Sequence, residues 1–204
     1  MNKIVVVSPA GSGMNFAVEA LNIAFKERAI GGKHIRSEID ESAKQIAIIR
    51  NPYDAIASGA ERWINTSGHR DFDNKKAELL DIKDTQAVVL TIDSHSREYI
   101  NFFKDIEAID NIKLFSFEFV TQNHNQFIKE VAEYFGISPI VEEVLIKDIF
   151  YQIDLKNNRN RRPRETTEAR KIIDDLVKKS YAQDNWEAWE IYSGLKANLD
   201  AKGL

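Results

Sequence analysis

The sequence predicts an α/β fold of three layers, in which helices flank a mostly parallel central sheet. Short β-branched runs alternate with longer segments of helical periodicity, a pattern typical of parallel sheets with right-handed crossovers. The length of 204 residues suits one hydrophobic core rather than two, so we expect residues 1–204 to form a single domain. Ligands of such folds bind at the carboxyl ends of the strands.

Strands and helices are expected in alternation along the chain. Four short apolar runs have the composition of buried strands, at residues 4–8, 46–49, 87–92 and 112–117. Helices are expected over 14–29, from Pro52, from Ser94 or Ser96, from Asn123 or Asn125, over 139–149, from Thr166 or Thr167, and through Trp186 to Leu195. Gly31-Gly32 and Gly136 are expected to end two of these helices. The polar segments 66–85 and 154–164 indicate surface loops.

Composition excludes several classes of function. The net charge of −4 disfavours nucleic-acid binding driven by bulk positive charge. The absence of cysteine excludes disulfides, thiolate metal sites and a cysteine nucleophile. The first apolar run is too short for a signal-peptide core or a membrane span, so we expect a cytoplasmic protein without a membrane partner.

The turn after the first strand is a candidate anion site. Small residues let backbone N–H groups approach a phosphate, and a helix N-terminus adds a favourable dipole. The candidate donors are Gly11, Ser12, Gly13, Met14 and Asn15. The alternative is an ordinary tight turn. A nucleoside-triphosphate loop would end in Gly-Lys-Ser/Thr, whereas Met14 follows Gly13 here, so ATP or GTP hydrolysis is disfavoured.

The second strand leads into the most informative stretch. Arg50 leaves a buried strand at its carboxyl end, and Ser58 lies about two turns into the following helix. An arginine offers a planar fork to a phosphate, and a serine hydroxyl can add one donor. The alternative is a surface arginine and an unrelated helix serine.

These motifs resemble the sulfotransferase family, which uses 3′-phosphoadenosine-5′-phosphosulfate (PAPS). Arg50-Asn51-Pro52-Tyr53-Asp54, with Ser58 eight residues after the arginine, resembles the family's 3′-phosphate motif. Residues 9–16 resemble its 5′-phosphosulfate loop, Pro-Lys-Ser-Gly-Thr-Thr, and residues 112–136 resemble a later strand-helix unit. The resemblance implies a P-loop-like sulfotransferase fold and transfer of a sulfuryl group from PAPS to a hydroxyl or amine of a small-molecule or glycan acceptor, without a metal.

The sequence departs from the family pattern in the first loop. Gly11 replaces the loop lysine that stabilises charge on the leaving phosphate, and one extra residue follows Pro9. A non-catalytic nucleotide-binding protein on the same scaffold therefore remains an alternative. A kinase is a second alternative, because residues 88–93 resemble a strand that ends in a magnesium-binding aspartate.

Two basic segments are further candidates. Lys33-His34 resembles the family's Lys-Thr-His segment, which implies that His34 is the catalytic base and that Lys33 replaces the missing loop lysine; the alternative is a polar loop with a lone histidine. Within the arginine cluster at 159–164, Arg161 and Arg162 are candidates to contact the nucleotide, and a solvated charge run is the alternative. His69, His95 and His124 are expected on the surface.

Overall fold

A computed structural model gives the structure of most of the chain. The described residues are 3–26, 29–33, 39–40, 42–66, 85–104, 106–139, 168–180 and 186–204. They include both candidate phosphate motifs. The predictions for residues 67–84, 140–149 and 154–164, and for a helix cap at Thr166 or Thr167, lie outside them.

The described strands form one parallel sheet, as the sequence predicts. Its four strands lie in the order β2-β1-β3-β4. Their bounds are Ile4–Val7 for β1, Ala29–Lys33 for β2, Gln45–Ile49 for β3 and Ile112–Ser116 for β4. Every residue of β3 is buried, which agrees with a strand covered on both faces.

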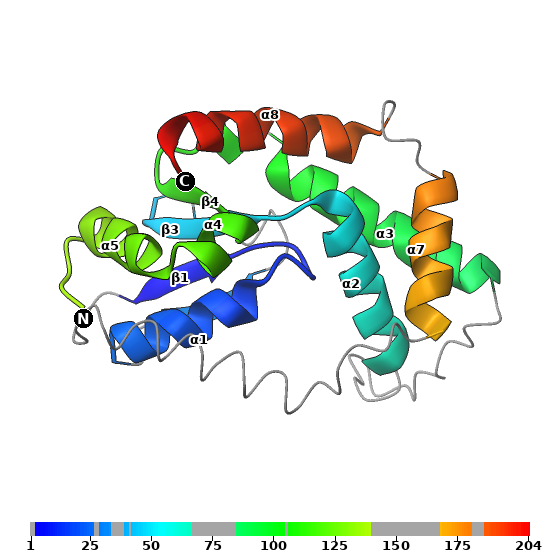
Figure 1. Cartoon of the computed structure of the whole chain (residues 1–204), viewed down its shortest axis with the longest axis horizontal. Helices are drawn as coiled ribbons and strands as arrows, with labels where there is room; N and C mark the ends of the chain where they lie inside the picture. The colour runs from blue at the N-terminus through cyan, green and yellow to red at the C-terminus, as the bar shows by residue number, and fades with distance from the viewer. Residues whose placement is uncertain are drawn as a thin grey trace.

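Helices cover both faces of this sheet and complete three layers (Figure 1). One buried cluster joins the sheet to α1 (Met14–Ala24), α4 (Phe117–Gln122) and α5 (His124–Phe135). The other joins it to α2 (Pro52–Thr66), α3 (Thr85–Phe103), α7 (Glu168–Ser180) and α8 (Glu187–Lys202). A short 3₁₀ helix, η3 (Ile106–Ala108), precedes β4. In Figure 1, α8 lies above the sheet and α1 below it.

The helix boundaries follow local capping chemistry. Asn123 precedes α5 as its N-cap, and Gly136 ends it at φ +65°, the left-handed region that favours glycine. Ser116 caps α4, because its hydroxyl accepts a hydrogen bond from the Phe119 N–H at 3.1 Å. No helix in the described part of the chain combines the length and apolarity needed to cross a membrane.

Two predicted elements are wrong. Residues 87–92 are not a strand but the first half of α3, and Ser94 and Ser96 lie inside that helix rather than at its start. The buried side chains of Val88, Ile92 and Ser96 repeat every four residues, so tertiary packing decides over β-branched propensity. Asp93 therefore does not end a strand, and the kinase alternative loses its only motif.

The second error concerns the end of the first helix. Gly31 and Gly32 do not stop α1, which ends at Ala24, but lie within β2, a strand that the sequence did not predict. A Cβ at Gly31 would lie 2.9 Å from Val18 Cγ2, so the glycine lets α1 approach the strand closely.

Candidate functional site

The two candidate phosphate motifs begin at the ends of neighbouring strands. β1 pairs in parallel with β3, with Val7 opposite Ala47, so both strands end at the same edge of the sheet. The helices that follow them, α1 and α2, then pack on opposite faces. A point where successive helices turn to opposite faces is where parallel sheets bind ligands.

The first loop is fixed to β3 at its start. Ser8 is fully buried, and its hydroxyl accepts a hydrogen bond from the Ile48 N–H at 2.8 Å. The same hydroxyl lies 2.9 Å from the Ile48 carbonyl oxygen, to which it can donate. The chain therefore enters the loop at a fixed distance from the strand that carries Arg50.

Two glycines let the loop pack closely against its neighbours. Gly11 has φ +84° and Gly13 has φ +92°, both in the left-handed region. A Cβ at Gly11 would overlap the carbonyl oxygen of Ala55, and a Cβ at Gly13 would overlap the ring of Phe117. The loop is thus packed between the first turns of α2 and the residue that follows β4.

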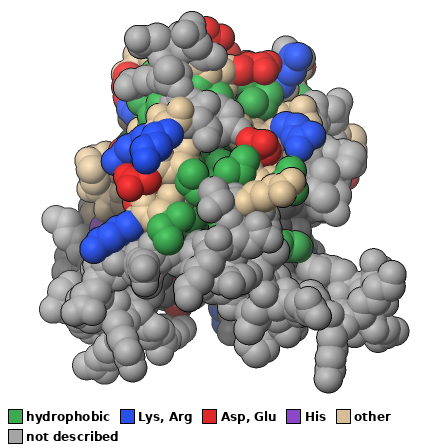
Figure 2. Space-filling model, turned by 90° about the vertical axis from the view of Figure 1, so that its right-hand side faces the viewer, with side chains coloured by type: hydrophobic (Ala, Val, Ile, Leu, Met, Phe, Trp, Pro, Cys, Tyr) green, Lys and Arg blue, Asp and Glu red, His purple; other side chains and the backbone are tan. Residues whose placement is uncertain are grey.

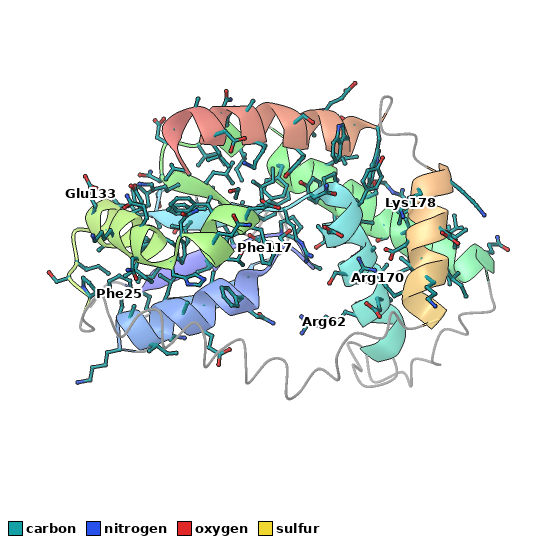
Figure 3. All side chains as sticks on the ribbon, viewed as in Figure 1. Phe25, Arg62, Phe117, Glu133, Arg170 and Lys178 are labelled. Carbon is teal, nitrogen blue, oxygen red and sulfur yellow. The ribbon has the colours of Figure 1, made fainter. Side chains whose placement is uncertain are left out.

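Arg50 joins the two motifs directly. Its Nη1 donates a hydrogen bond to the Gly11 carbonyl at 3.1 Å, and its guanidinium lies 4.6 Å from the centre of the Phe117 ring. The backbone carbonyl of Arg50 accepts a hydrogen bond from the Tyr99 hydroxyl at 2.7 Å. Figure 3 shows Phe117 at the centre of the molecule, beside the end of the sheet. The first loop and the stretch that begins at Arg50 therefore meet.

The loop and the start of α1 have unused capacity for an anion. The Ser12 side chain is fully buried, and its Oγ has no hydrogen-bond partner among the described residues. Gly13 is the N-cap of α1 and supplies no side-chain bond, and the first turn of α1 contains no acidic residue. The first N–H groups of a helix lack partners within it, so this end of α1 favours a phosphate. Met14 is buried here and Asn15 is exposed.

Ser58 lies on the side of α2 that faces a second arginine. Arg50, Asp54, Ser58 and Glu61 follow one another at helical spacing. Arg170, on α7, lies 3.7 Å from Asp54 and 3.6 Å from Glu61, and its Nε is 2.8 Å from Asp174. Arg50 also lies 3.9 Å from Asp54, so this carboxylate is shared by two arginines.

Arg170 differs from the other basic residues of its helix. Its side chain is only 12% exposed, and Figure 3 shows it between α2 and α7. Lys171, Lys178 and Lys179 are exposed. The face of the molecule around α7 carries basic, acidic and apolar side chains next to one another (Figure 2). Arg170 is therefore a partly buried component of the packing between α2 and α7.

Aromatic residues at the start of α8 pack against Tyr53, near the start of α2. The Tyr53 ring lies 4.9 Å from that of Trp186 and 5.5 Å from that of Trp189. Tyr192 follows on α8, and burial, together with the negative charges of Glu118, Asp200 and Asp54, raises its pKa to about 12. Burial also raises the pKa of Tyr99 well above its ordinary value. Both phenols are therefore neutral hydrogen-bonding groups at physiological pH.

Four predicted site residues are not tested by this geometry. Lys33 pairs with Val7 at the end of β2, which places its backbone at the same edge of the sheet as the first loop. Its side chain, and all of His34, Arg161 and Arg162, lie outside the described parts of the chain. Their roles stay predictions.

Two residues near the site were missed by reasoning from sequence. Arg170 forms an i,i+4 pair with Asp174 that can be read from sequence, but its contacts with α2 depend on tertiary packing. His95 was expected on the surface, yet it is half-buried and its ring packs against Gly59 of α2. Among the described residues, no cluster of three or more histidine or acidic side chains could hold a metal ion.

Comparisons with known proteins identify the family of this sequence and a solved structure with a similar fold. A family model described as a sulfotransferase domain matches residues 30–196. The crystal structure of mouse sulfotransferase SULT7A1 complexed with PAP has a TM-score of 0.56 and 15% sequence identity, and the match covers 97% of this chain and 89% of that one. No curated protein sequence matches the chain. The family resemblance and the fold class read from the sequence are thereby confirmed.

Proposed function

Because the chain belongs to the sulfotransferase family, we propose that it transfers a sulfuryl group from PAPS to a hydroxyl or amine of a small-molecule or glycan acceptor. The observation that carries this proposal is the hydrogen bond between Arg50 and the Gly11 carbonyl. It brings together the stretches expected to bind the two phosphate-bearing ends of one nucleotide. The PAP in the matched mouse structure supports the same class of nucleotide.

The first loop suits the 5′ end of this donor. The Ser12 hydroxyl and the first N–H groups of α1 can donate to phosphate oxygens, and Gly11 and Gly13 keep side chains out of their way. The donor supplies an activated sulfuryl group on its 5′-phosphate. The dipole of α1 and the N–H groups of residues 11–15 would stabilise the negative charge that develops there.

Arg50 and Ser58 suit the 3′-phosphate. Arg50 is 17% exposed, and it is oriented by Gly11, Phe117 and Asp54. A guanidinium held in place in this way loses little entropy when it binds a phosphate oxygen. Arg161 and Arg162 are proposed to add to this end of the site, and Lys33 and His34 to act at the transferring group and at the acceptor.

A second candidate function is nucleotide binding without catalysis. It is favoured by the contact between Gly11 and the Ala55 carbonyl, which leaves no space for any side chain at position 11. The charge of a loop lysine would have to come from elsewhere, and Lys33 is the candidate that the sequence offers.

Calorimetric titration with adenosine 3′,5′-bisphosphate, followed by a turnover assay with PAPS, separates these functions. We expect micromolar or tighter binding of the bisphosphate, and much weaker binding of adenosine 5′-monophosphate, which lacks the 3′-phosphate. Sulfuryl transfer to any member of a panel of phenols, alcohols, amines and glycans would establish the enzyme. Binding without turnover would favour the second function, and absence of binding would reject both.

A further inference from the structure

Arg170 reaches the two acidic residues that lie on either side of Ser58 along α2. Its Nη2 lies 3.7 Å from Asp54 Oδ1, and its Nη1 lies 3.6 Å from Glu61 Oε2. Asp54, Ser58 and Glu61 follow one another at helical spacing, which places them on one face of α2. A guanidinium that reaches both carboxylates from the side of α7 therefore lies beside the part of α2 that carries Ser58 (Figure 3).

The position of this guanidinium is fixed from its own helix. The Nε of Arg170 donates a hydrogen bond to Asp174 at 2.8 Å, while both Nη atoms approach α2. Ile173 and Val177, on the same helix, are buried in the core cluster that α7 shares with α2. This apolar packing should hold α7 in place when the charge at position 170 is changed.

Asp54 links this guanidinium to Arg50, the candidate phosphate residue. One carboxylate oxygen, Oδ1, faces Arg170, and the other, Oδ2, lies 3.9 Å from Arg50 Nη2. A carboxylate that is shared between two cations is held less strongly by each of them. Arg170 thereby reduces the competition that Asp54 offers to a phosphate at Arg50.

The charges on α2 explain why an anion needs this second arginine. A phosphate bound by Arg50 and Ser58 would lie close to the carboxylates of Asp54 and Glu61, which repel it. The Glu61 side chain is only 19% exposed, against 54% for Asp54, so water and salt screen its charge less. Without a cation at position 170, Arg50 would be opposed by two carboxylates on the same face.

We infer that Arg170 is a positioning residue of the nucleotide site, and this inference rests on the proposed function. Arg170 neutralises the acidic face of α2, so that Arg50 and Ser58 can bind the 3′-phosphate of the donor. It acts through Asp54 and Glu61 rather than by binding the nucleotide. Its effect is therefore confined to ligands that carry a 3′-phosphate.

The test measures the affinity of charge variants for two nucleotides by calorimetric titration. In Arg170→Gln, which keeps polar donors but loses the charge, we expect affinity for adenosine 3′,5′-bisphosphate to fall at least about tenfold, while affinity for adenosine 5′-monophosphate changes less than about threefold. Arg170→Lys retains the charge and should bind the bisphosphate within about threefold of the unmodified protein. As a control, Lys171→Gln removes a charge from the exposed neighbouring position and should leave both affinities unchanged.

A second-site variant separates the effect of charge from an effect on folding. When Arg170→Gln is combined with Glu61→Gln, the less exposed carboxylate is also neutral, so bisphosphate affinity should return to within about threefold of that of the unmodified protein. Glu61→Gln alone should bind the bisphosphate at least as tightly as the unmodified protein, because a repelling charge is removed. This single variant decides the question even if Arg170→Gln does not fold.

Two classes of result would overturn the inference. One is an Arg170→Gln variant that keeps its bisphosphate affinity or loses affinity equally for both nucleotides, since the second outcome indicates a merely structural role. The other is weaker bisphosphate binding in Glu61→Gln, or no recovery in the combined variant. An unmodified protein that does not bind the bisphosphate would instead reject the proposed function, and with it this inference.

Discussion

Replacing Gly11 by alanine tests the packing of the first loop on α2. Gly11 has φ +84°, and a left-handed conformation costs an L-residue roughly 1–2 kcal/mol. The new methyl group would also overlap the Ala55 carbonyl oxygen, which is backbone inside a helix and cannot turn away. Forcing an extra methyl into a packed site costs typically 1–3 kcal/mol. We therefore expect Gly11→Ala to lower the free energy of unfolding by about 2–5 kcal/mol.

Gly136→Ala provides a matched control. Gly136 has φ +65°, but a Cβ there would meet no atom within 4 Å. This variant should show only the conformational cost of roughly 1–2 kcal/mol. Urea unfolding followed by tryptophan fluorescence measures both variants, and the difference between them isolates the clash between the loop and α2.

A Gly11→Ala variant no less stable than Gly136→Ala would contradict the expected clash between the loop and α2. That result would mean that the loop does not lie against the first turns of α2. The hydrogen bond from Arg50 to Gly11, and with it the meeting of the two candidate phosphate motifs, would then lose its support.

Three further predictions concern charged and phenolic groups. Arg50→Ala should weaken binding of adenosine 3′,5′-bisphosphate by about 1.5–3 kcal/mol, or roughly 10–150-fold by calorimetry, because it removes charged hydrogen bonds. Arg62→Ala, at an exposed position of α2, should leave the affinity unchanged. The pKa of Tyr192 is raised to about 12, so this residue stabilises the fold below pH 10, and its contribution is lost as the pH rises toward 12. Between pH 9 and pH 11.5, the free energy of unfolding in urea should therefore decline less in Tyr192→Phe than in the unmodified protein. The hydrogen bond from Lys113, at 2.6 Å, is the main cause of a lowered pKa at Glu130, so the stability that this pair contributes should be present above the ordinary glutamate pKa and lost on acidification. An NMR titration in which the pKa of Glu130 lies at or above the ordinary value would contradict this prediction.

The sequence predicted the central strands because burial on both faces leaves a plain signal. β1 and residues 46–49 of β3 are uninterrupted apolar runs. β2 gave no such signal, because it is an edge strand with two glycines and an exposed Ile30. Residues 87–92 gave a false one, because β-branched residues also occur on the buried side of a helix.

The candidate site was predictable only where its residues are close in sequence. Arg50 lies two residues before α2 and Ser58 lies within it, eight residues further on, and the first loop is a compact motif, so both candidates could be proposed from residues close in sequence. His95 and Arg170 come from α3 and α7, and their contacts with α2 arise from how those helices pack. Sequence periodicity indicates which face of a helix is buried, but not which neighbour it meets.

The role of Phe117 has a consequence for how this protein tolerates change. Ile49 pairs with Ser116, so Arg50 and Phe117 are the next residues of adjacent strands, and the ring that borders Gly13 also covers the guanidinium. A slip of one residue between β3 and β4 would turn the side chains of β4 to the other face of the sheet and move Phe117 out of register with Arg50. Insertions or deletions within β3 or β4 should therefore be accepted only when the pairing of these two strands is restored.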